Sequence, residues 1–191
     1  MAIVKARLTG NAPLILHNGR LANPLGYHSK ELKKISGKRK KTESDHMEMG
    51  RIEFHGGLYT NEDEKVIVPS EMFEACMKFA GRTCKLGKLV QAGLFCLNHS
   101  LLEFPDDDKT MEELWDSGNY QLQVMVKVGQ VQVLRTRPMF KSWACAIELT
   151  YSESILSESQ VIELLNIAGD QIGIGDWRPK YGRFSVEILN Q

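Results

Sequence analysis

The elements predicted along this sequence place the chain in the α+β class. An alternating apolar and polar run at residues 3–8 predicts a first strand, and amphipathic segments at 70–80 and 157–168 predict two helices. Alternating segments on either side of Gly129 and Gln130 predict an antiparallel β-hairpin. This order of strand, helix, antiparallel strands, helix and strand predicts a ferredoxin-like (RRM-like) β-α-β-β-α-β core with a long basic insertion and an extra β-hairpin.

Both core helices carry start and stop signals. Ser70, which follows a proline, marks the start of the first helix, and Gly81 closes it. Ser157 and Gln160 have the spacing of a capping box, and Gly169 ends the second helix. Further predicted elements are a helix from Thr42 to Phe54, a strand at 65–68, a short helix at 111–115, and strands at 142–151 and 184–189.

Length and composition predict a single domain over residues 1–191, in which residues 18–46 form the insertion. No stretch approaches the ~20 apolar residues of a membrane span, so we expect no membrane partner. The first residues, "MAIVKARLTG", lack the apolar region of a secretion signal. We therefore expect a cytoplasmic protein.

The cysteines and histidines do not have the spacing of a metal site. The sequence contains no C-x-x-C and no H-E-x-x-H, and most cysteines have apolar neighbours. We expect reduced, mostly buried thiols, no metal and no cofactor. The residues concerned are Cys76, Cys84, Cys96, Cys145, His17, His28, His46, His55 and His99.

Positive charge is concentrated in one segment although the formal net charge of the chain is zero. Residues 20–41 hold eight Lys and Arg against the single anion Glu31. This polar segment is predicted to be a long loop, and loops of this length are usually functional or disordered. Two interpretations stay open: a positive face for a polyanion, or a solvated disordered loop.

The segment "GIGDWRPKYGRF" at residues 173–184 combines three glycines with aromatic and basic residues. It does not match a dinucleotide-binding fingerprint, because a helical pattern precedes it and a strand follows it. The distance from Gly175 to Gly182 also excludes the spacing of a P-loop.

Three stretches together resemble the RAMP superfamily, the repeat-associated proteins of CRISPR effector complexes. They are "RLTGNAPLILHNGR" at 7–20, "VIVPSEMFEACMKFAG" at 66–81 and "IGIGDWRPKYGRFSVEIL" at 172–189. Ser70 stands where the family usually has glycine, and the chain is shorter than most backbone subunits. The resemblance is therefore to a minimal backbone-subunit-type member, stand-alone or phage-encoded.

The resemblance implies a non-catalytic protein that binds single-stranded nucleic acid, with RNA favoured over DNA, and assembles side by side along the strand. Copies of itself and other effector-complex subunits are the implied protein partners. Residues 18–46 correspond in position to a thumb-like segment. Glycines would let backbone approach phosphates, cations would supply charge, and aromatic rings would stack on bases. The predicted contact residues are Arg20, Lys33, Lys34, Lys38, Arg39, Lys40, Lys41, Lys78, Arg82, Lys85, Lys88, Arg135, Arg137, Gly173, Gly175, Trp177, Arg178, Lys180, Tyr181, Gly182 and Arg183.

Two other functions remain open at this point. Guide-processing members of the superfamily are metal-independent endoribonucleases, for which His17 or His28 would be the acid or base. Some backbone subunits of the superfamily cut target RNA with an aspartate in the inserted loop. Asp45 is the only aspartate of this insertion, and its position at a predicted helix start favours a capping role instead. We assign no catalytic residue. The second alternative is a structural or regulatory oligomer, phage-encoded, that engages a protein partner.

Overall fold

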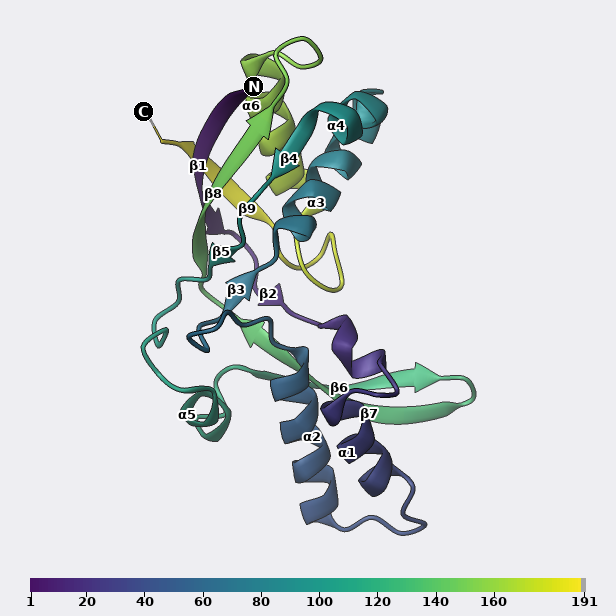
Figure 1. The fold of residues 1–191 in the computed structure, drawn as a ribbon. Helices are drawn as coiled ribbons and strands as arrows, with labels where there is room; N and C mark the ends of the chain where they lie inside the picture. Colours follow the sequence, from purple (N-terminus) through teal and green to yellow (C-terminus); the bar gives the residue numbers. More distant parts are fainter. Residues whose placement is uncertain (190–191) are drawn as a thin grey trace. The chain divides into compact units, whose positions relative to one another are not determined.

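The computed structural model describes residues 1–189 as a mixed α+β structure with antiparallel sheets (Figure 1). The chain packs into two compact units. Unit 1 contains Met1–Ile15, Thr60–Asp107 and the chain from Phe140 onward, and unit 2 contains Leu16–Tyr59 and Asp108–Met139. Unit 2 is therefore larger than the predicted insertion at 18–46, because it also includes the extra hairpin. No helix of residues 1–189 is long and apolar enough to span a membrane.

Unit 1 is built on a four-stranded sheet whose neighbouring strands are all antiparallel. The strands lie in the order β4 (Leu94–Cys96), β8 (Ala144–Tyr151), β1 (Ala2–Gly10) and β9 (Phe184–Ile188). The short strands β3 (Ile67–Val68) and β5 (Ser100–Leu101) form a separate pair, and β2 (Leu14–Ile15) follows β1. The strands predicted at both ends of the chain are thus confirmed and lie side by side.

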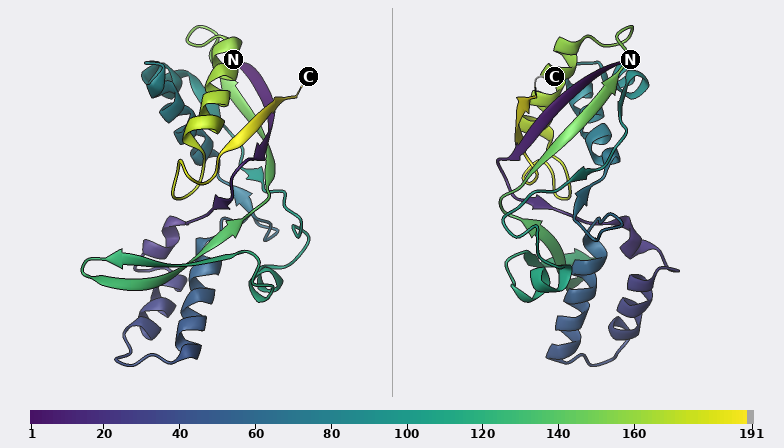
Figure 2. Two further views of the ribbon diagram at one scale, coloured as in Figure 1. Left: turned by 180° about the vertical axis from the view of Figure 1, so that it is seen from behind. Right: turned by 60° about the vertical axis from the view of Figure 1, so that its left-hand side comes forward.

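Two helices cover one face of this sheet, as the ribbon views show (Figure 2). They are α3 (Ser70–Thr83) and α6 (Glu158–Ile167), and both predicted helices are confirmed. Val4, Ala6 and Leu8 of β1 alternate toward the helices and are buried. The short helix α4 (Gly87–Gly93) follows α3, and one π-helical turn, η2 (Ala168–Ile172), follows α6.

The other face of the sheet carries ion pairs. Lys5 Nζ lies 3.4 Å from a carboxylate oxygen of Glu148 on the neighbouring strand. Arg7 donates from both terminal nitrogens to the carboxylate of Glu103, and one of these bonds measures 3.0 Å. These paired charges distinguish the face from the aromatic sheet surface with which RRM domains stack bases.

Unit 2 combines helices with a β-hairpin. Its elements are η1 (Gly19–Ala22), α1 (Tyr27–Ser36), α2 (Glu43–Gly57), α5 (Met111–Asp116), β6 (Gln121–Val128) and β7 (Val131–Phe140). The hairpin turns at Gly129, which has φ +61°, so that Val128 and Val131 face each other as predicted. Thr42 and Asp45 form a capping box at the start of α2, which confirms the capping role expected for Asp45.

Helix α1 corrects the prediction that residues 18–41 form a loop. His28, Leu32 and Ile35 recur at helical spacing, and all three are half-buried while the neighbouring lysines are exposed. Since α1 packs against α2, this narrow apolar stripe gains a partner. The prediction was wrong because it rested on the high polarity of the segment alone.

Candidate nucleic-acid interface

The glycine-rich segment at 173–183 folds back onto the backbone of unit 1. The N–H of Ile174 donates to the carbonyl of Gly182 at 2.9 Å, and the N–H of Gly182 donates to the carbonyl of Pro13 at 2.8 Å. The N–H of Asp176 donates to the carbonyl of Ile15, also at 2.8 Å. These bonds close the loop on itself and fasten it beside β2.

The glycines are required by this closed shape. Gly182 has φ +70°, and a Cβ added there would lie 1.8 Å from the carbonyl oxygen of Ile174. Gly175 has φ +80°, and its Cβ would lie 2.4 Å from the carbonyl oxygen of Ile15. Glycine alone meets both demands, a left-handed φ and no side chain. The role predicted for Gly173, Gly175 and Gly182, approach of backbone to a phosphate, stays a prediction.

Beside the loop, arginine side chains from two parts of the chain lie against one exposed aromatic ring. Phe79 of α3 is 40% exposed. The Cζ atoms of Arg82 and Arg178 lie 4.9 Å and 5.3 Å from its ring centroid, within cation–π range. No ion pair within residues 1–189 engages either arginine.

A second aromatic pair lies within the loop. The ring centroids of Trp177 and Tyr181 are 6.1 Å apart, and Lys180 Nζ lies 5.4 Å from the Tyr181 centroid. Trp177 has φ +55°, an uncommon conformation for a bulky residue. Its backbone N–H donates to Asp176 Oδ1 at 3.1 Å. Backbone outliers of this kind concentrate at binding sites. We call the set Phe79, Arg82, Trp177, Arg178, Lys180 and Tyr181 the Phe79 cluster.

The Phe79 cluster borders a depression of about 500 Å³. Its lining is formed by the ring of Phe79, the end of η2 and the first half of the loop, including Trp177 and Arg178. The rings of Phe79 and Trp177 and the guanidinium of Arg178 thus share a concave surface. This combination suits a ligand that has both flat apolar faces and negative charge.

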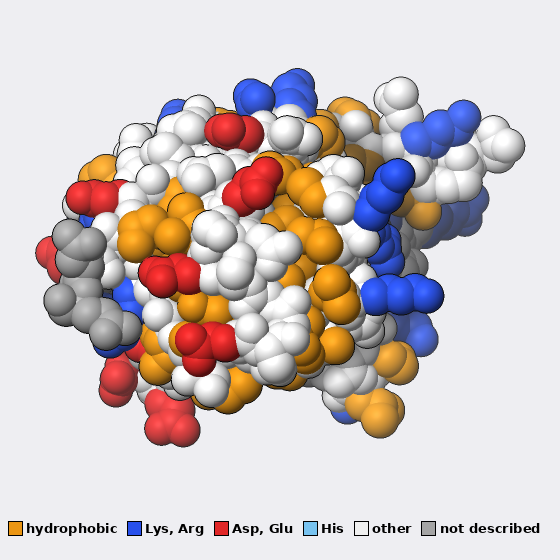
Figure 3. Space-filling model, turned by 90° about the horizontal axis from the view of Figure 1, so that it is seen from above, with side chains coloured by type: hydrophobic (Ala, Val, Ile, Leu, Met, Phe, Trp, Pro, Cys, Tyr) orange, Lys and Arg blue, Asp and Glu red, His pale blue; other side chains and the backbone are white. Residues whose placement is uncertain are grey.

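The remaining predicted cations of unit 1 lie on α3, in the connection from α3 to α4, on α4 and at the end of the loop. Lys78 is half-buried on α3, whereas Lys85, Lys88 and Arg183 are exposed. On the face of the molecule seen in Figure 3, acidic and apolar side chains are interspersed, and the Lys and Arg side chains lie at the margin of the view. That face is therefore not a basic surface.

In unit 2, several predicted contacts are engaged by the protein itself. Arg20 Nε donates to the carbonyl of Gly56 at 3.0 Å, and its Nη2 donates to that of His55, so Arg20 caps the end of α2. Burial lowers the pKa of Arg20. Lys34 pairs with Glu31 and Lys38 with Asp45, each at 2.6 Å. The fold itself therefore uses the guanidinium of Arg20, and its assignment as a phosphate contact stays a prediction.

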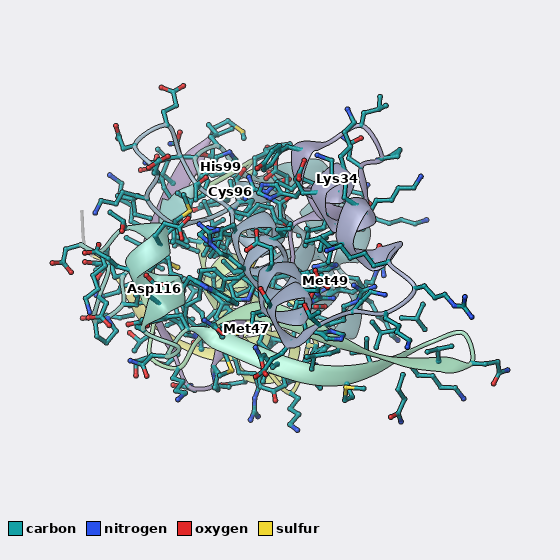
Figure 4. The ribbon with its side chains drawn as sticks, turned by 90° about the horizontal axis from the view of Figure 1, so that it is seen from below. Lys34, Met47, Met49, Cys96, His99 and Asp116 are labelled. Atoms are coloured by element: carbon teal, nitrogen blue, oxygen red, sulfur yellow. The ribbon has the colours of Figure 1, made fainter. Side chains whose placement is uncertain are left out.

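Other predicted residues of unit 2 come together around one cavity. Lys33, Arg135 and Arg137 line it together with His17, although they come from separate parts of the sequence. Arg39, Lys40 and Lys41 precede α2; the first two are exposed, and Lys41 donates to the carbonyl of Lys38 at 3.1 Å. Lys34 of α1 and Met49 of α2 are labelled in the view from below (Figure 4).

The histidines considered for catalysis, His17 and His28, both belong to unit 2. His28 is half-buried, and its pKa is lowered by burial, then by Arg20 and His55. His17 is exposed, and its carbonyl accepts from the Tyr59 hydroxyl at 3.2 Å. Within residues 1–189, no three His, Cys, Asp or Glu are placed to hold a metal ion.

The cysteines are free thiols, and three of them are buried. Burial raises the pKa of Cys76 and Cys145 to about 12 and that of Cys96 to about 11. Such thiols have little thiolate at neutral pH and act as apolar side chains. The prediction of mostly buried, unbridged thiols is confirmed.

Phe79 is the member of the cluster that sequence reasoning missed. Its position falls outside the apolar stripe of α3, which runs through Phe73, Cys76, Met77 and Ala80. An aromatic residue off the stripe, three positions before Arg82, was the available signal. No protein-family model matches this chain, and no curated protein matches its sequence.

Proposed function

We propose that this chain binds single-stranded nucleic acid, RNA in preference to DNA, through the Phe79 cluster. The observation that carries the proposal is the placement of two guanidinium groups, those of Arg82 and Arg178, against the exposed ring of Phe79. Phe79, Arg178 and Trp177 also line one concave surface, and the ring of Trp177 is paired with that of Tyr181. Unpaired bases stack on exposed rings, and arginine and lysine contact the phosphates between them.

The geometry of the cluster supports recognition of a strand with unstacked bases. Its rings come from a helix and from a loop fastened by backbone hydrogen bonds, so they are held in place before a ligand arrives. Stacking on each ring contributes about 1–3 kcal/mol and depends little on base identity. Arg82, Arg178 and Lys180 add charge that does not select a sequence. We therefore propose binding with little sequence preference.

The topology of unit 1 supports a ferredoxin-like assignment. Numbered along the chain, its four main strands β1, β4, β8 and β9 lie in the order 2-3-1-4, and all neighbours are antiparallel. Helix α3 precedes the second of these strands and α6 precedes the fourth. This order supports the proposal of a β-α-β-β-α-β unit into which the segments of unit 2 are inserted. The proposal of a minimal RAMP-type member rests on this order and on the three sequence stretches.

A backbone-type member assembles along its ligand. We propose that copies of this chain bind side by side on one strand, alone or with other effector-complex subunits. Such assembly makes binding cooperative and dependent on strand length, whereas a single isolated site gives one binding step at any length above its own footprint.

Fluorescence anisotropy tests the proposal. A labelled ~30-mer of RNA and one of single-stranded DNA are titrated across a salt series, because phosphate contacts make affinity fall as salt rises. The Phe79→Ala/Trp177→Ala variant removes two stacking rings and is expected to weaken binding at least about tenfold, since each ring contributes 1–3 kcal/mol.

Phe95→Ala is the matched control. Phe95 lies on β4 of the same unit and is 37% exposed, close to the 40% of Phe79. It does not line the depression. Equal losses in both variants, or affinity that does not change with salt, would overturn the proposal.

A further inference from the structure

Unit 2 contains a cavity of about 360 Å³ that the proposed function does not use. Residues of η1, α1, α2 and β7 line it. Its charged lining residues are Lys33, Glu53, Arg135 and Arg137, and His17 also lines it. Three cations against one carboxylate leave a net charge of about +2 with the histidine neutral. A concave site with this excess attracts an anion of matching charge.

The single carboxylate is buried and positions one of the cations. Glu53 is 3% exposed, and its Oε2 accepts the N–H of Thr136 at 2.7 Å. Its Oε1 accepts from Arg135 Nη1, which joins α2 to β7. A buried ion pair is costly unless its geometry is fixed by further hydrogen bonds, as it is here. Glu53 therefore holds the Arg135 guanidinium at the cavity while satisfying only part of its five donors.

The other two cations reach the cavity from different elements. Lys33 is an exposed residue of α1, and no ion pair within residues 1–189 engages it. Arg137 is half-buried on β7, two residues after Arg135, so both arginine side chains leave the same side of the strand. Met49 of α2, labelled in Figure 4, contributes to the apolar part of the lining.

We propose that this cavity binds a phosphate monoester dianion, with Lys33, Arg135 and Arg137 as the donors and Glu53 as a positioning residue. Arginine forks match the oxygen geometry of phosphate, and a dianion balances the excess charge. The volume lies at the lower end of the 300–1,000 Å³ that small-molecule sites occupy, so a phosphate with an attached sugar fits better than a long ligand. The inference does not depend on the function proposed for unit 1.

The phosphate has two possible sources, and the experiment separates them. One is a free mononucleotide, and the other is the terminal phosphate of an oligonucleotide. Isothermal titration calorimetry uses inorganic phosphate, adenosine 5′-monophosphate and adenosine as probes. Anisotropy compares a 5′-phosphorylated RNA with the same RNA carrying a 5′-hydroxyl. We expect adenosine 5′-monophosphate to bind and adenosine not to bind.

The Lys33→Ala/Arg137→Ala variant is expected to lose at least about tenfold in affinity for the monophosphate, because two charge-assisted contacts to the phosphate are removed. Lys30→Ala/Lys34→Ala is the matched control: it removes two lysines of α1 that do not line the cavity. Ala22→Trp is a second test that removes no charge: Ala22 lines the cavity, and an indole at this position is expected to occupy part of its volume. Retained monophosphate binding in Ala22→Trp would contradict the proposal.

Each result decides the inference. Phosphate-dependent binding that the Lys33/Arg137 variant loses supports it, and preference for the 5′-phosphorylated RNA identifies the strand end as the source. Absence of phosphate-dependent binding in every arm, or equal loss in the Lys30/Lys34 control, overturns it. The Phe79→Ala/Trp177→Ala variant keeps the response to phosphate, so failure of the unit 1 proposal remains distinguishable from failure of this one.

Discussion

The two units place their cations in different surroundings. In unit 1, Arg82 and Arg178 lie against the ring of Phe79, and no ion pair of residues 1–189 engages them. In unit 2, Arg20 donates to backbone carbonyls at the end of α2, and Arg135 pairs with the buried Glu53. The density of positive charge is higher in unit 2, but more of that charge is committed to holding the unit together.

This difference shows why a count of lysines and arginines is a weak guide to a binding surface. Residues 20–41 hold eight cations, yet Arg20, Lys34 and Lys38 already have protein partners. A cation that stacks on an exposed ring keeps its hydrogen-bond donors for a ligand, whereas one that caps a helix does not. The surroundings of each cation therefore carry more information than its charge.

The largest expected effect comes from closing the space at Gly182. In Gly182→Ala the new Cβ meets the Ile174 carbonyl oxygen, and the left-handed φ becomes strained. We expect a loss of about 3 kcal/mol or more in the stability of unit 1, from overpacking added to backbone strain. Urea unfolding monitored by circular dichroism measures it, and anisotropy should show that nucleic-acid binding falls with it.

Gly129→Ala is the control for this prediction. Gly129 has a similar φ of +61°, but a Cβ there has no heavy atom within 4 Å. Its cost is therefore the strain alone, about 1–2 kcal/mol. If the two variants lose equal stability, the closed shape of the loop does not depend on the missing side chain at Gly182.

The second-largest expected loss of stability comes from removing the buried carboxylate of Glu53 in unit 2. Glu53→Ala leaves the N–H of Thr136 and the guanidinium of Arg135 without their acceptor. We expect unit 2 to lose about 2–3 kcal/mol, since an unsatisfied buried partner costs more than the pair contributes. Urea unfolding checks this against Glu112→Ala, which removes an exposed pair with Arg51 and should cost less than about 1 kcal/mol. Equal costs would mean that burial adds nothing to the Glu53 pair.

Local sequence signals predicted most of the elements. The capping residues Thr42 and Ser157 fix where α2 and α6 begin through bonds to residues three positions later. Gly129 fixes the hairpin because a tight turn needs its positive φ. Each of these features depends on neighbours in the chain, so the sequence displays it directly.

The features that escaped prediction depend on residues far apart in the chain. Helix α1 needs the surface of α2 to cover its narrow apolar stripe, and polarity alone suggested a loop. Phe79 and Arg178 meet only after the chain has folded, and so do Glu53 and Arg135. Among the predicted contact residues, the loop aromatics and Arg82 come together, whereas Arg20 serves the fold.

A smaller effect is expected when the histidines of unit 2 take up protons. Burial is the main cause that lowers the pKa of His28 and of His55 below 6.5. The unfolded chain therefore binds more protons below about pH 6.5, and unit 2 loses stability as the pH falls from there through the folded pKa values. The urea concentration at the midpoint of unfolding should be lower at about pH 5.5 than at about pH 7.5.

Variants of the two histidines test whether they cause this dependence of stability on pH. In His28→Asn/His55→Asn the change in the urea midpoint between the two pH values should shrink. Glu112 stays ionised over this range because Arg51 lowers its pKa. A slope that survives the double substitution would assign the acid sensitivity to other groups.

The smallest expected effect is on RNA affinity, and it concerns two exposed cations of unit 2. Arg39 and Lys40 are exposed and precede α2, where no aromatic ring of the described chain lies in cation–π contact with them. If they contact RNA, each does so as a screened charge, so Arg39→Ala/Lys40→Ala should weaken binding less than about tenfold and reduce the slope of affinity against salt by about 1.4. The ring variant of unit 1 should lose more affinity with little change in that slope, because stacking releases no counterions. If the Arg39/Lys40 variant loses more affinity than the Phe79/Trp177 variant, the main binding surface lies in unit 2 and not in unit 1.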